Sequence, residues 1–175
     1  MSGTAPRLLL TDSREKWTQD GSTDTHIKDY LIKHDIPYKV VKLDTGDYTF
    51  DGTIVVDRKQ NLEEVSRNLL NRNDSSRFWR EVRRAYQSGI KLVILVEHGP
   101  SVKSINDVAK WRSAYSGVSG RAVVDAMIRC EMAYGVVWQF CSKRSTAKKI
   151  IEILSSSDKL NNKIKLKGEN NNGKH

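Results

Sequence analysis

The sequence predicts an α/β fold in which a central sheet carries helices on both faces. Strand-like and helix-like segments alternate along most of the chain, and such alternation packs helices against a sheet. Residues 91–97 (KLVILVE) have a continuous apolar run at 92–96, which is typical of a strand buried on both faces. Apolar residues at helical spacing in residues 121–134, followed by Gly135, indicate a helix that ends at this glycine.

The remaining elements follow from the same patterns of apolar residues and caps. The predicted strands are residues 7–11, 37–43, a hairpin over 46–59, 91–97 and 136–141. The predicted helices are residues 22–35, 61–70, 76–88, 121–134 and 146–154. Thr23 or Asp24 can cap the first helix, and Asn61 with Glu64 three residues later is close to a capping box. Residues 98–119 form a long connection.

Length and charge limit the classes of protein to consider. The chain of 175 residues is long enough for one domain with a real core, and its 30 basic and 21 acidic residues give a net charge of +9. A basic balance suits a polyanionic partner such as nucleic acid. Cys130 and Cys141 lack a metal-ligand spacing, which indicates reduced core residues of an intracellular protein.

The sequence also predicts where the chain lies in the cell and where its folded part ends. With no apolar run of membrane length and no signal-peptide core, we expect no membrane partner and a cytoplasmic location, or a nuclear one in a eukaryote. Residues 159–175 hold five lysines, five asparagines and one glutamate, a composition that cannot build a core. We therefore expect one domain over residues 1–156 and a basic, disordered tail over residues 157–175.

The hairpin carries the main functional signal, GDYTFDGTIVVDRK (residues 46–59). Asp57 and Lys59 are two residues apart on a strand, so their side chains share one face. A two-residue loop turns Asp47 away from Asp57, whereas a three-residue loop over 51–53 or a bulge places Asp47 opposite Asp57. We predict the second arrangement, because a cation between two adjacent carboxylates gives this charge a purpose.

Mg²⁺ or Mn²⁺ is the cation that fits such a hairpin. Both prefer hard oxygen ligands, commonly one or two carboxylates with water and phosphate. A metal held there polarises a phosphodiester and generates hydroxide. Lys59 can orient or deprotonate the attacking water, or offset charge in the transition state, and the residues alone leave these roles open.

Four segments in order resemble the XPF/Mus-type structure-specific endonucleases. They are LLLTDSRE (8–15), GDY (46–48), VVDRKQNLEE (55–64) and SRFWREVRR (76–84). The hallmark of that family is GDx…ERKxxxD, and here Asp57 stands for its glutamate and Glu63 for its final aspartate. Both departures keep a carboxylate at a different side-chain length. The resemblance covers residues 7–154.

The resemblance implies a restriction-endonuclease-like core of the PD-(D/E)xK type, with a mixed central sheet flanked by helices. It also implies Mg²⁺ or Mn²⁺ as cofactor and hydrolysis of one strand near a branch or flap in DNA. The implied catalytic residues are Asp12, Asp47, Asp57 and Lys59, of which the three aspartates hold metal. Glu15, Arg58 and Glu63 would brace the site. Nuclease domains of this family pair with each other, which points to a homodimer through the helices at 121–134 and 146–155.

Basic residues on one helix support a DNA partner independently of the resemblance. On a helical wheel of residues 76–88, Arg77, Arg80 and Arg84 gather on one side, while Phe78 and its apolar neighbours face the core. Aligned arginines can track a phosphate backbone without reading bases. With Arg14 after the first strand, they are the candidate DNA-binding residues.

Two alternatives to a flap endonuclease stay open. A domain of the same fold can bind branched DNA or scaffold an active partner without catalysis, because a fold does not by itself give a function. A junction resolvase or restriction-type nuclease on the same core differs mainly in substrate. The connection at 98–119, with Trp111, Arg112 and Tyr115, is a candidate contact surface for DNA or a partner.

Overall fold

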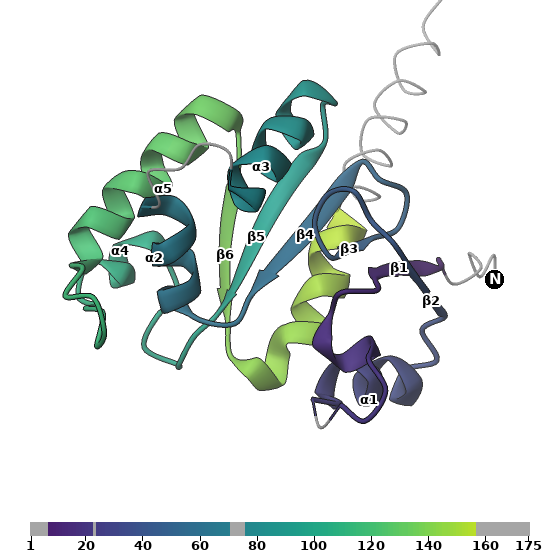
Figure 1. Ribbon diagram of the computed structural model, residues 1–175. Helices are drawn as coiled ribbons and strands as arrows, with labels where there is room; N and C mark the ends of the chain where they lie inside the picture. Colours follow the sequence, from purple (N-terminus) through teal and green to yellow (C-terminus); the bar gives the residue numbers. More distant parts are fainter. Residues whose placement is uncertain (1–6, 23, 71–75, 157–175) are drawn as a thin grey trace, which may run out of the picture.

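One six-stranded sheet forms the centre of the molecule, with helices on both faces (Figure 1). The computed structural model describes residues 7–22, 24–70 and 76–156. In spatial order the strands are β2 (Tyr38–Val41), β1 (Leu9–Asp12), β3 (Tyr48–Thr49), β4 (Ile54–Lys59), β5 (Lys91–Glu97) and β6 (Val137–Cys141). The predicted α/β architecture is confirmed, and the tail predicted for residues 157–175 lies outside the described residues.

The sheet is mixed because one short strand runs against the others. β1 pairs with β2 in parallel, and β4, β5 and β6 form a second parallel group. The two residues of β3 pair antiparallel with β1 on one side and with β4 on the other. β3 therefore joins the two parallel groups at the centre of the sheet.

Four helices cover one face of the sheet: α2 (Leu62–Leu70), α3 (Arg77–Gln87), α4 (Ile105–Val108) and α5 (Gly120–Tyr134) (Figure 1). Their apolar sides join alternate strand residues, such as Val55 and Ile94, in one buried cluster. Six of the seven residues of β5 are buried, as its apolar run predicts. α2 begins as expected, because the Asn61 side chain accepts from the backbone N–H of Glu64.

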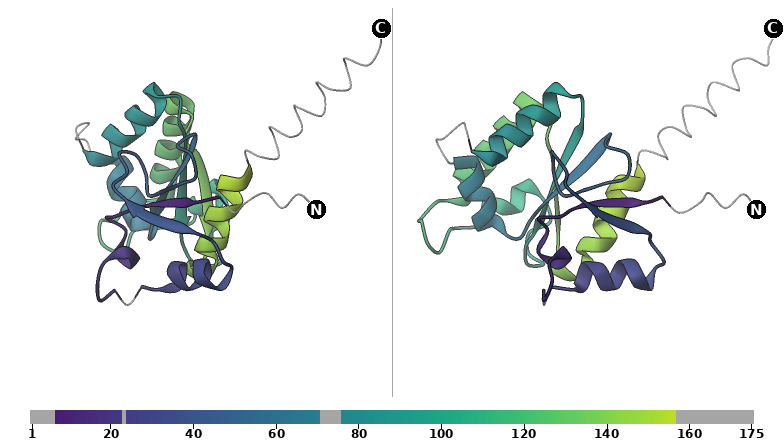
Figure 2. Two further views of the ribbon diagram at one scale, coloured as in Figure 1. Left: turned by 90° about the vertical axis from the view of Figure 1, so that its right-hand side faces the viewer. Right: turned by 45° about the vertical axis from the view of Figure 1, so that its right-hand side comes forward.

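The opposite face is covered by α1 (His26–Lys33) and by the C-terminal helix, residues 146–156 (Figure 2). Ile27 and Leu31 of α1 and Ile150 of the C-terminal helix pack on Val56 and Val93 of the sheet. Two 3-10 turns, Lys16–Thr18 and Lys143–Ser145, complete this side. The residue at the N-cap position of α1 is Thr25, one residue after Asp24 and two after Thr23, which lies outside the described residues.

The hairpin has the register of the three-residue loop. Tyr48 pairs with Val56 and Thr49 with Val55, which leaves residues 51–53 at the tip. The Thr49 hydroxyl donates to the Ile54 carbonyl at 2.7 Å and accepts from a backbone N–H of the tip. Beyond Tyr48 the backbone N–H of Asp47 donates to the Val56 carbonyl at 2.8 Å, and the side chains of Asp47 and Asp57 line one cavity.

The connection at 98–119 has more structure than the sequence predicts. It contains the single turn α4, which Ser104 and Asp107 close with a capping box.

Both cysteines are free, with Cys130 buried and Cys141 half-buried. Within residues 7–22, 24–70 and 76–156, none of the helices combines the length and the apolar character that crossing a membrane requires.

Gly120 is the tightest backbone approach in this region. A Cβ atom added there would lie 1.9 Å from the Val108 carbonyl oxygen and 2.5 Å from the Trp111 carbonyl oxygen. We expect Gly120→Ala to lower the free energy of unfolding by about 1–3 kcal/mol, because two backbone segments must separate. Urea denaturation measures the change. Gly99→Ala is the matched control, since a Cβ at Gly99 meets open space, and an equal loss in both variants would contradict a steric role for Gly120.

Candidate active site

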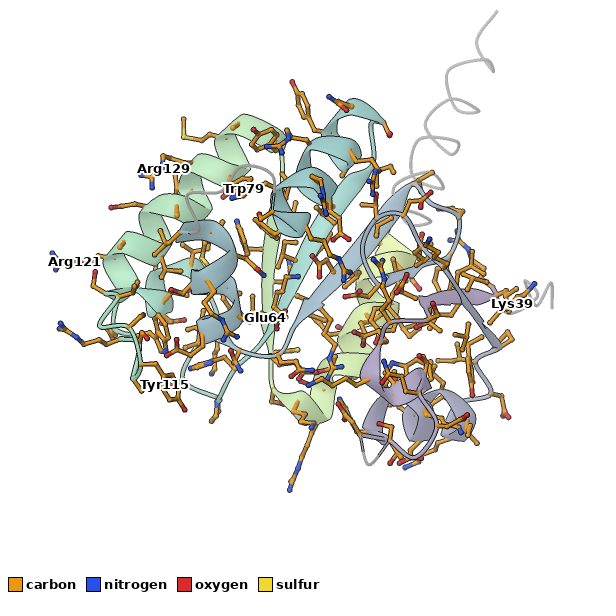
Figure 3. All side chains as sticks on the ribbon, viewed as in Figure 1. Lys39, Glu64, Trp79, Tyr115, Arg121 and Arg129 are labelled. Atoms are coloured by element: carbon orange, nitrogen blue, oxygen red, sulfur yellow. The ribbon has the colours of Figure 1, made fainter. Side chains whose placement is uncertain are left out.

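A cleft of about 450 Å³ opens where β4 ends, between α2, α3 and the segment that follows β1. Glu64, labelled in Figure 3, marks the wall that α2 forms. The cleft is lined by Arg14, Glu15, Lys16, Asp47, Asp57, Arg58, Lys59, Gln60, Glu64, Arg67, Asn68, Arg77, Phe78 and Glu81. Its volume is in the range of ligand sites, and its lining is dominated by charged and polar side chains.

Asp47 and Asp57 lie together in this cleft, and both are buried. One carboxylate oxygen of Asp47 accepts from the backbone N–H of Arg58 at 2.8 Å, which holds it against β4. Burial and the negative charges of Asp57 and Glu15 raise the pKa of Asp47 well above its usual range. The fold thus brings two carboxylates together at a cost, which a cation between them would offset.

Lys59 stands beside this pair. Its Nζ donates to Asp57 Oδ1 at 2.7 Å, lies 3.9 Å from Glu64 Oε1, and sits 5.7 Å from the centre of the Phe78 ring. Burial alone lowers the pKa of Lys59, but Asp57 and Asp47 together raise that pKa above its ordinary value. Lys59 is therefore an ammonium at neutral pH in this arrangement.

Arg58 points to the opposite face of the sheet, where a buried network fixes β4. Its guanidinium contacts Glu97 at 2.7 Å, Glu15 at 3.0 Å and Asp24 at 3.3 Å. Glu15 also accepts from the Tyr48 hydroxyl, and burial raises the pKa of its carboxyl. The network connects β4 with β5, β3 and the segment after β1, so Arg58 and Glu15 brace the strand that carries Asp57.

The structure does not bring Asp12 into the cleft. Asp12 is fully buried, and its two oxygens accept from Arg14 at 2.5 and 3.0 Å and from the Leu43 backbone N–H at 2.7 Å. Burial raises the pKa of Asp12, but these hydrogen bonds from Arg14 and Leu43 outweigh it and lower the pKa. The backbone N–H of Asp12 also donates to the Asp47 carbonyl at 2.8 Å. Asp12 thus holds Arg14 and Asp47 in place, and both of its carboxylate oxygens are engaged by Arg14 and Leu43.

Glu63 also lies away from the cleft lining. Its carboxylate accepts from the Ser113 hydroxyl at 2.9 Å and from the Ala114 backbone N–H at 3.0 Å. The residue that stands for the final aspartate of the hallmark therefore braces the loop at 112–119, which is distant in sequence.

The candidate DNA-binding arginines meet in a second hollow of about 210 Å³ that adjoins the cleft. Arg14, Arg77 and Glu81 line both cavities. The second hollow is lined by Arg14, Lys42, Leu43, Asp44, Arg77, Arg80, Glu81 and Arg84. We call this surface the basic groove. The helical wheel thus identified arginines that the fold does gather, and Lys42 was missed because it lies on another strand end.

Glu81 is a cleft residue that the sequence patterns did not single out. It is buried, accepts from Arg77 Nε at 3.0 Å and lies 3.9 Å from an Arg14 nitrogen. It thus holds two guanidinium groups at the boundary between the cleft and the basic groove. The signal that could have found it is its spacing of four residues from Arg77 and its place as the only acidic residue of helix 77–87.

The donor set of the cleft fits a hard divalent cation held partly by its substrate. No group of three or more His, Cys, Asp or Glu side chains in the described ranges is arranged to hold a metal ion. Mg²⁺ is commonly bound through one or two carboxylates with substrate phosphate and water. Asp47 and Asp57 supply that smaller set.

The fold is that of a restriction-endonuclease-like core, and its cleft places two carboxylates and a lysine around one buried strand. The model of the ERCC4 domain family matches residues 11–154, so the chain belongs to the ERCC4 domain family. The resemblance to XPF-type nucleases is thereby confirmed.

Solved structures agree with this fold. XPF from Aeropyrum pernix in complex with DNA superimposes with a TM-score of 0.62 at 19% identity, covering 87% of this chain and 66% of that chain. XPF from Aeropyrum pernix gives 0.63 at 21% identity, covering 90% of this chain and 68% of that one. The chain thus spans about two thirds of these proteins. A comparison with curated proteins finds no match.

The two kinds of carboxylate predict opposite effects on stability. The lowered pKa of Asp12 stabilises the fold at neutral pH and loses its effect as the pH falls through that pKa. We expect Asp12→Asn to lower the free energy of unfolding by about 1–3 kcal/mol. The raised pKa of Asp47 has the reverse sign, so its charge destabilises the fold at neutral pH. Asp47→Asn should stabilise by about 0.5–2 kcal/mol.

Thermal and urea denaturation without divalent metal measure both changes. The advantage of Asp47→Asn over the wild type should shrink as the pH falls, because protonation removes the same charge. If Asp47→Asn lowers the free energy of unfolding as much as Asp12→Asn does, the charge of Asp47 does not destabilise the fold, and this interpretation is wrong.

Proposed function

We propose that the chain is a metal-dependent endonuclease that hydrolyses phosphodiester bonds in branched DNA. The observation that supports this most is the cleft at the end of β4, where two buried carboxylates and Lys59 border the basic groove. Membership of the ERCC4 domain family supports nuclease chemistry. The XPF structure in complex with DNA supports DNA as the substrate class.

Asp47 and Asp57 are the residues that would hold Mg²⁺ or Mn²⁺. When bound, such an ion polarises a phosphodiester and lowers the pKa of its water. Arg58 keeps these carboxylates in place, since its backbone N–H donates to Asp47 and its guanidinium is fixed on the other face. Asp12 and Glu63 are left out of this metal set because their oxygens serve other contacts.

Lys59 and two arginines supply the positive charge around the reacting phosphate. Lys59 is held on the cleft wall by Asp57, where its ammonium can offset the charge that develops on a phosphate. Arg14 and Arg77 lie where the cleft meets the basic groove, and each is kept there by a buried carboxylate. They can orient the scissile phosphate before attack.

The basic groove extends this surface along the DNA backbone. Arg80 and Lys42 are exposed and make no ion pair with a described residue, so both side chains can reach a phosphate. Contacts of this kind fix the position of a strand without reading its sequence. We therefore propose recognition of DNA through its backbone, which agrees with a substrate defined by shape.

A non-catalytic DNA-binding domain is the second candidate. The observation that favours it is the small number of carboxylates left for a metal in the cleft, since Asp12 and Glu63 are engaged elsewhere.

Pairing of two copies through α5 and the C-terminal helix also stays a prediction. Ile128 and Met132 of α5 are exposed, whereas Ile150 and Leu154 of the C-terminal helix are buried against the sheet.

Cleavage of labelled DNA decides between these functions. Flap, fork, four-way junction and continuous duplex are incubated side by side with Mg²⁺, with Mn²⁺ and with a chelator. We expect metal-dependent nicking of branched substrates, and a fall of roughly 100-fold or more in Asp57→Ala and Lys59→Ala. Asp51→Asn is the matched control, because Asp51 is an exposed carboxylate at the tip of the same hairpin.

One result of this experiment would contradict catalysis. Wild-type protein that binds these substrates but leaves all of them intact under every metal condition is the non-catalytic domain. Cutting confined to four-way junctions, or equal cutting of continuous duplex, indicates the resolvase or restriction-type alternative instead.

The basic groove predicts a change in salt dependence. We expect Arg80→Ala and Arg84→Ala each to weaken binding of all DNA structures and to reduce the slope of log K against log salt by about 1. Fluorescence anisotropy over a salt series measures this slope. Arg129→Ala, on α5 and outside the groove (Figure 3), is the control and should leave it unchanged. Unchanged slopes in both groove variants would contradict the proposed path of the strand.

A further inference from the structure

The segment 112–119 is a tightly built loop that projects from the helical face. An isolated bridge joins Arg112 to Ser119, and the backbone N–H of Ser113 donates to the Val118 carbonyl at 2.9 Å. Gly117 has a φ of +70°, a conformation that glycine adopts without strain. The loop is thus a small hairpin with its own internal hydrogen bonds.

Ser113 fixes this loop to α2. Its buried hydroxyl oxygen accepts from the backbone N–H groups of Tyr115 and Ser116 at 3.2 and 2.9 Å and donates to Glu63 at 2.9 Å. The Ala114 backbone N–H reaches the other Glu63 oxygen at 3.0 Å. The loop is therefore held rigidly on a helix whose neighbouring residues line the cleft.

Tyr115 stands at the tip with 90% of its surface exposed, the largest fraction for any large hydrophobic side chain in the described residues. Figure 3 shows it projecting from the loop at the edge of the molecule, away from the body of the domain. The hydrogen bonds of Ser113 fix the backbone that carries this ring, because the Ser113 hydroxyl oxygen accepts from the backbone N–H of Tyr115 itself. A fixed, exposed aromatic ring is a ready surface for a partner.

The charge around Tyr115 selects the kind of partner. Residues 108–124 contain Lys110, Arg112 and Arg121 and no acidic residue, and the adjacent Glu63 carboxylate is engaged by the Ser113 hydroxyl and the Ala114 backbone N–H. Arg121 opens α5 beside the loop (Figure 3). A flat ring with cations around it matches a nucleic acid, in which bases offer π faces and phosphates offer negative charge.

We propose that Tyr115 is a stacking site for an exposed base of branched DNA, an inference that rests on the proposed function. Inside a continuous duplex both faces of every base pair are already stacked. A base has a free face only at an end, at a branch point or in a single strand. Tyr115 therefore binds where the duplex is interrupted, and it contributes selectivity for DNA structure.

Glu63 and α2 give this stacking site a fixed relation to the cleft. Glu63 holds the loop, while Glu64, Arg67 and Asn68 of the same helix line the cleft. A branch point or strand end that binds at Tyr115 therefore lies at a constant distance from Asp57 and Lys59. The position of the cut relative to the branch follows from this separation.

Binding measurements without divalent metal test the stacking site. Fluorescence anisotropy compares fork, flap and single strand with a covalently closed circular duplex, which has no free end, for wild type, Tyr115→Ala and Tyr115→Phe. We expect Tyr115→Ala to weaken binding to the first three by roughly 5- to 100-fold and to leave duplex binding within about two-fold. Tyr115→Phe keeps the ring and should bind like wild type. Tyr86→Ala is the control, because Tyr86 is an exposed tyrosine on α3.

A fluorescent base analogue, 2-aminopurine, placed at the branch point reports stacking directly. Wild type and Tyr115→Phe should quench it, and Tyr115→Ala should not. Equal effects of Tyr115→Ala on branched and continuous DNA, or no effect on either, overturn the inference while metal-dependent nicking by wild type stands. Loss of branch-selective binding in Tyr115→Ala supports the stacking site even if no variant cuts DNA. A wild type that binds no branched DNA overturns both proposals.

Discussion

The whole structure depends on one constraint, which is that β4 is a buried strand with charged side chains on both faces. Its residues from Ile54 to Lys59 are all buried, and three of them carry charge. Burying charge is costly unless each group is paired. Arg58 meets three carboxylates on one face, and Lys59 meets Asp57 on the other. The arrangement of β1, β3, β5 and α1 around β4 follows from the need to supply these partners.

The charged side chains on the two faces of β4 are paired in different ways. Those on one face brace the fold, and those on the other line the cleft. Around Arg58 three carboxylates share one guanidinium that contacts all of them, Asp24 also lies 3.4 Å from Lys143, and Glu97 accepts from Thr146 of the C-terminal helix at 2.6 Å. Around Asp47 and Asp57 the two negative charges share the ammonium of Lys59, which donates to Asp57. A protein that satisfies one face and leaves the other under-compensated has a site that a cation can complete. The proximity of two carboxylates that share one ammonium is the feature on which the proposed metal site rests.

Sequence reasoning recovered the parts of the structure that depend on local periodicity. The shared face of Asp57 and Lys59 follows from alternation along a strand, and the clustering of the α3 arginines follows from helical spacing. The single turn α4 was missed because four residues are too short for a periodic signal, although Ser104 and Asp107 form a capping pattern that marks it.

The hydrogen-bond partners of the carboxylates near the site could not be predicted from the sequence. A motif places the Cα atom of Asp12 near the site, but it does not say that Arg14 two residues later will take both oxygens. Glu63 accepts a hydrogen bond from Ser113, which lies fifty residues later in the sequence. Glu81 lines the cleft from α3, a helix whose sequence pattern pointed only to its arginines. Residue type and spacing therefore predicted which segments meet, and only the fold showed which oxygens stay available.

The two-residue strand β3 has a consequence for how the domain assembles. The segment from β4 to β6 has parallel pairs, helices and a core that form within one contiguous stretch, whereas β1 and β2 join the sheet only through β3. Folding can thus complete the C-terminal portion first and add the N-terminal portion across a narrow seam. Because Asp47 immediately precedes β3 and Asp57 lies on β4, the repelling carboxylates meet only when β3 pairs with β4.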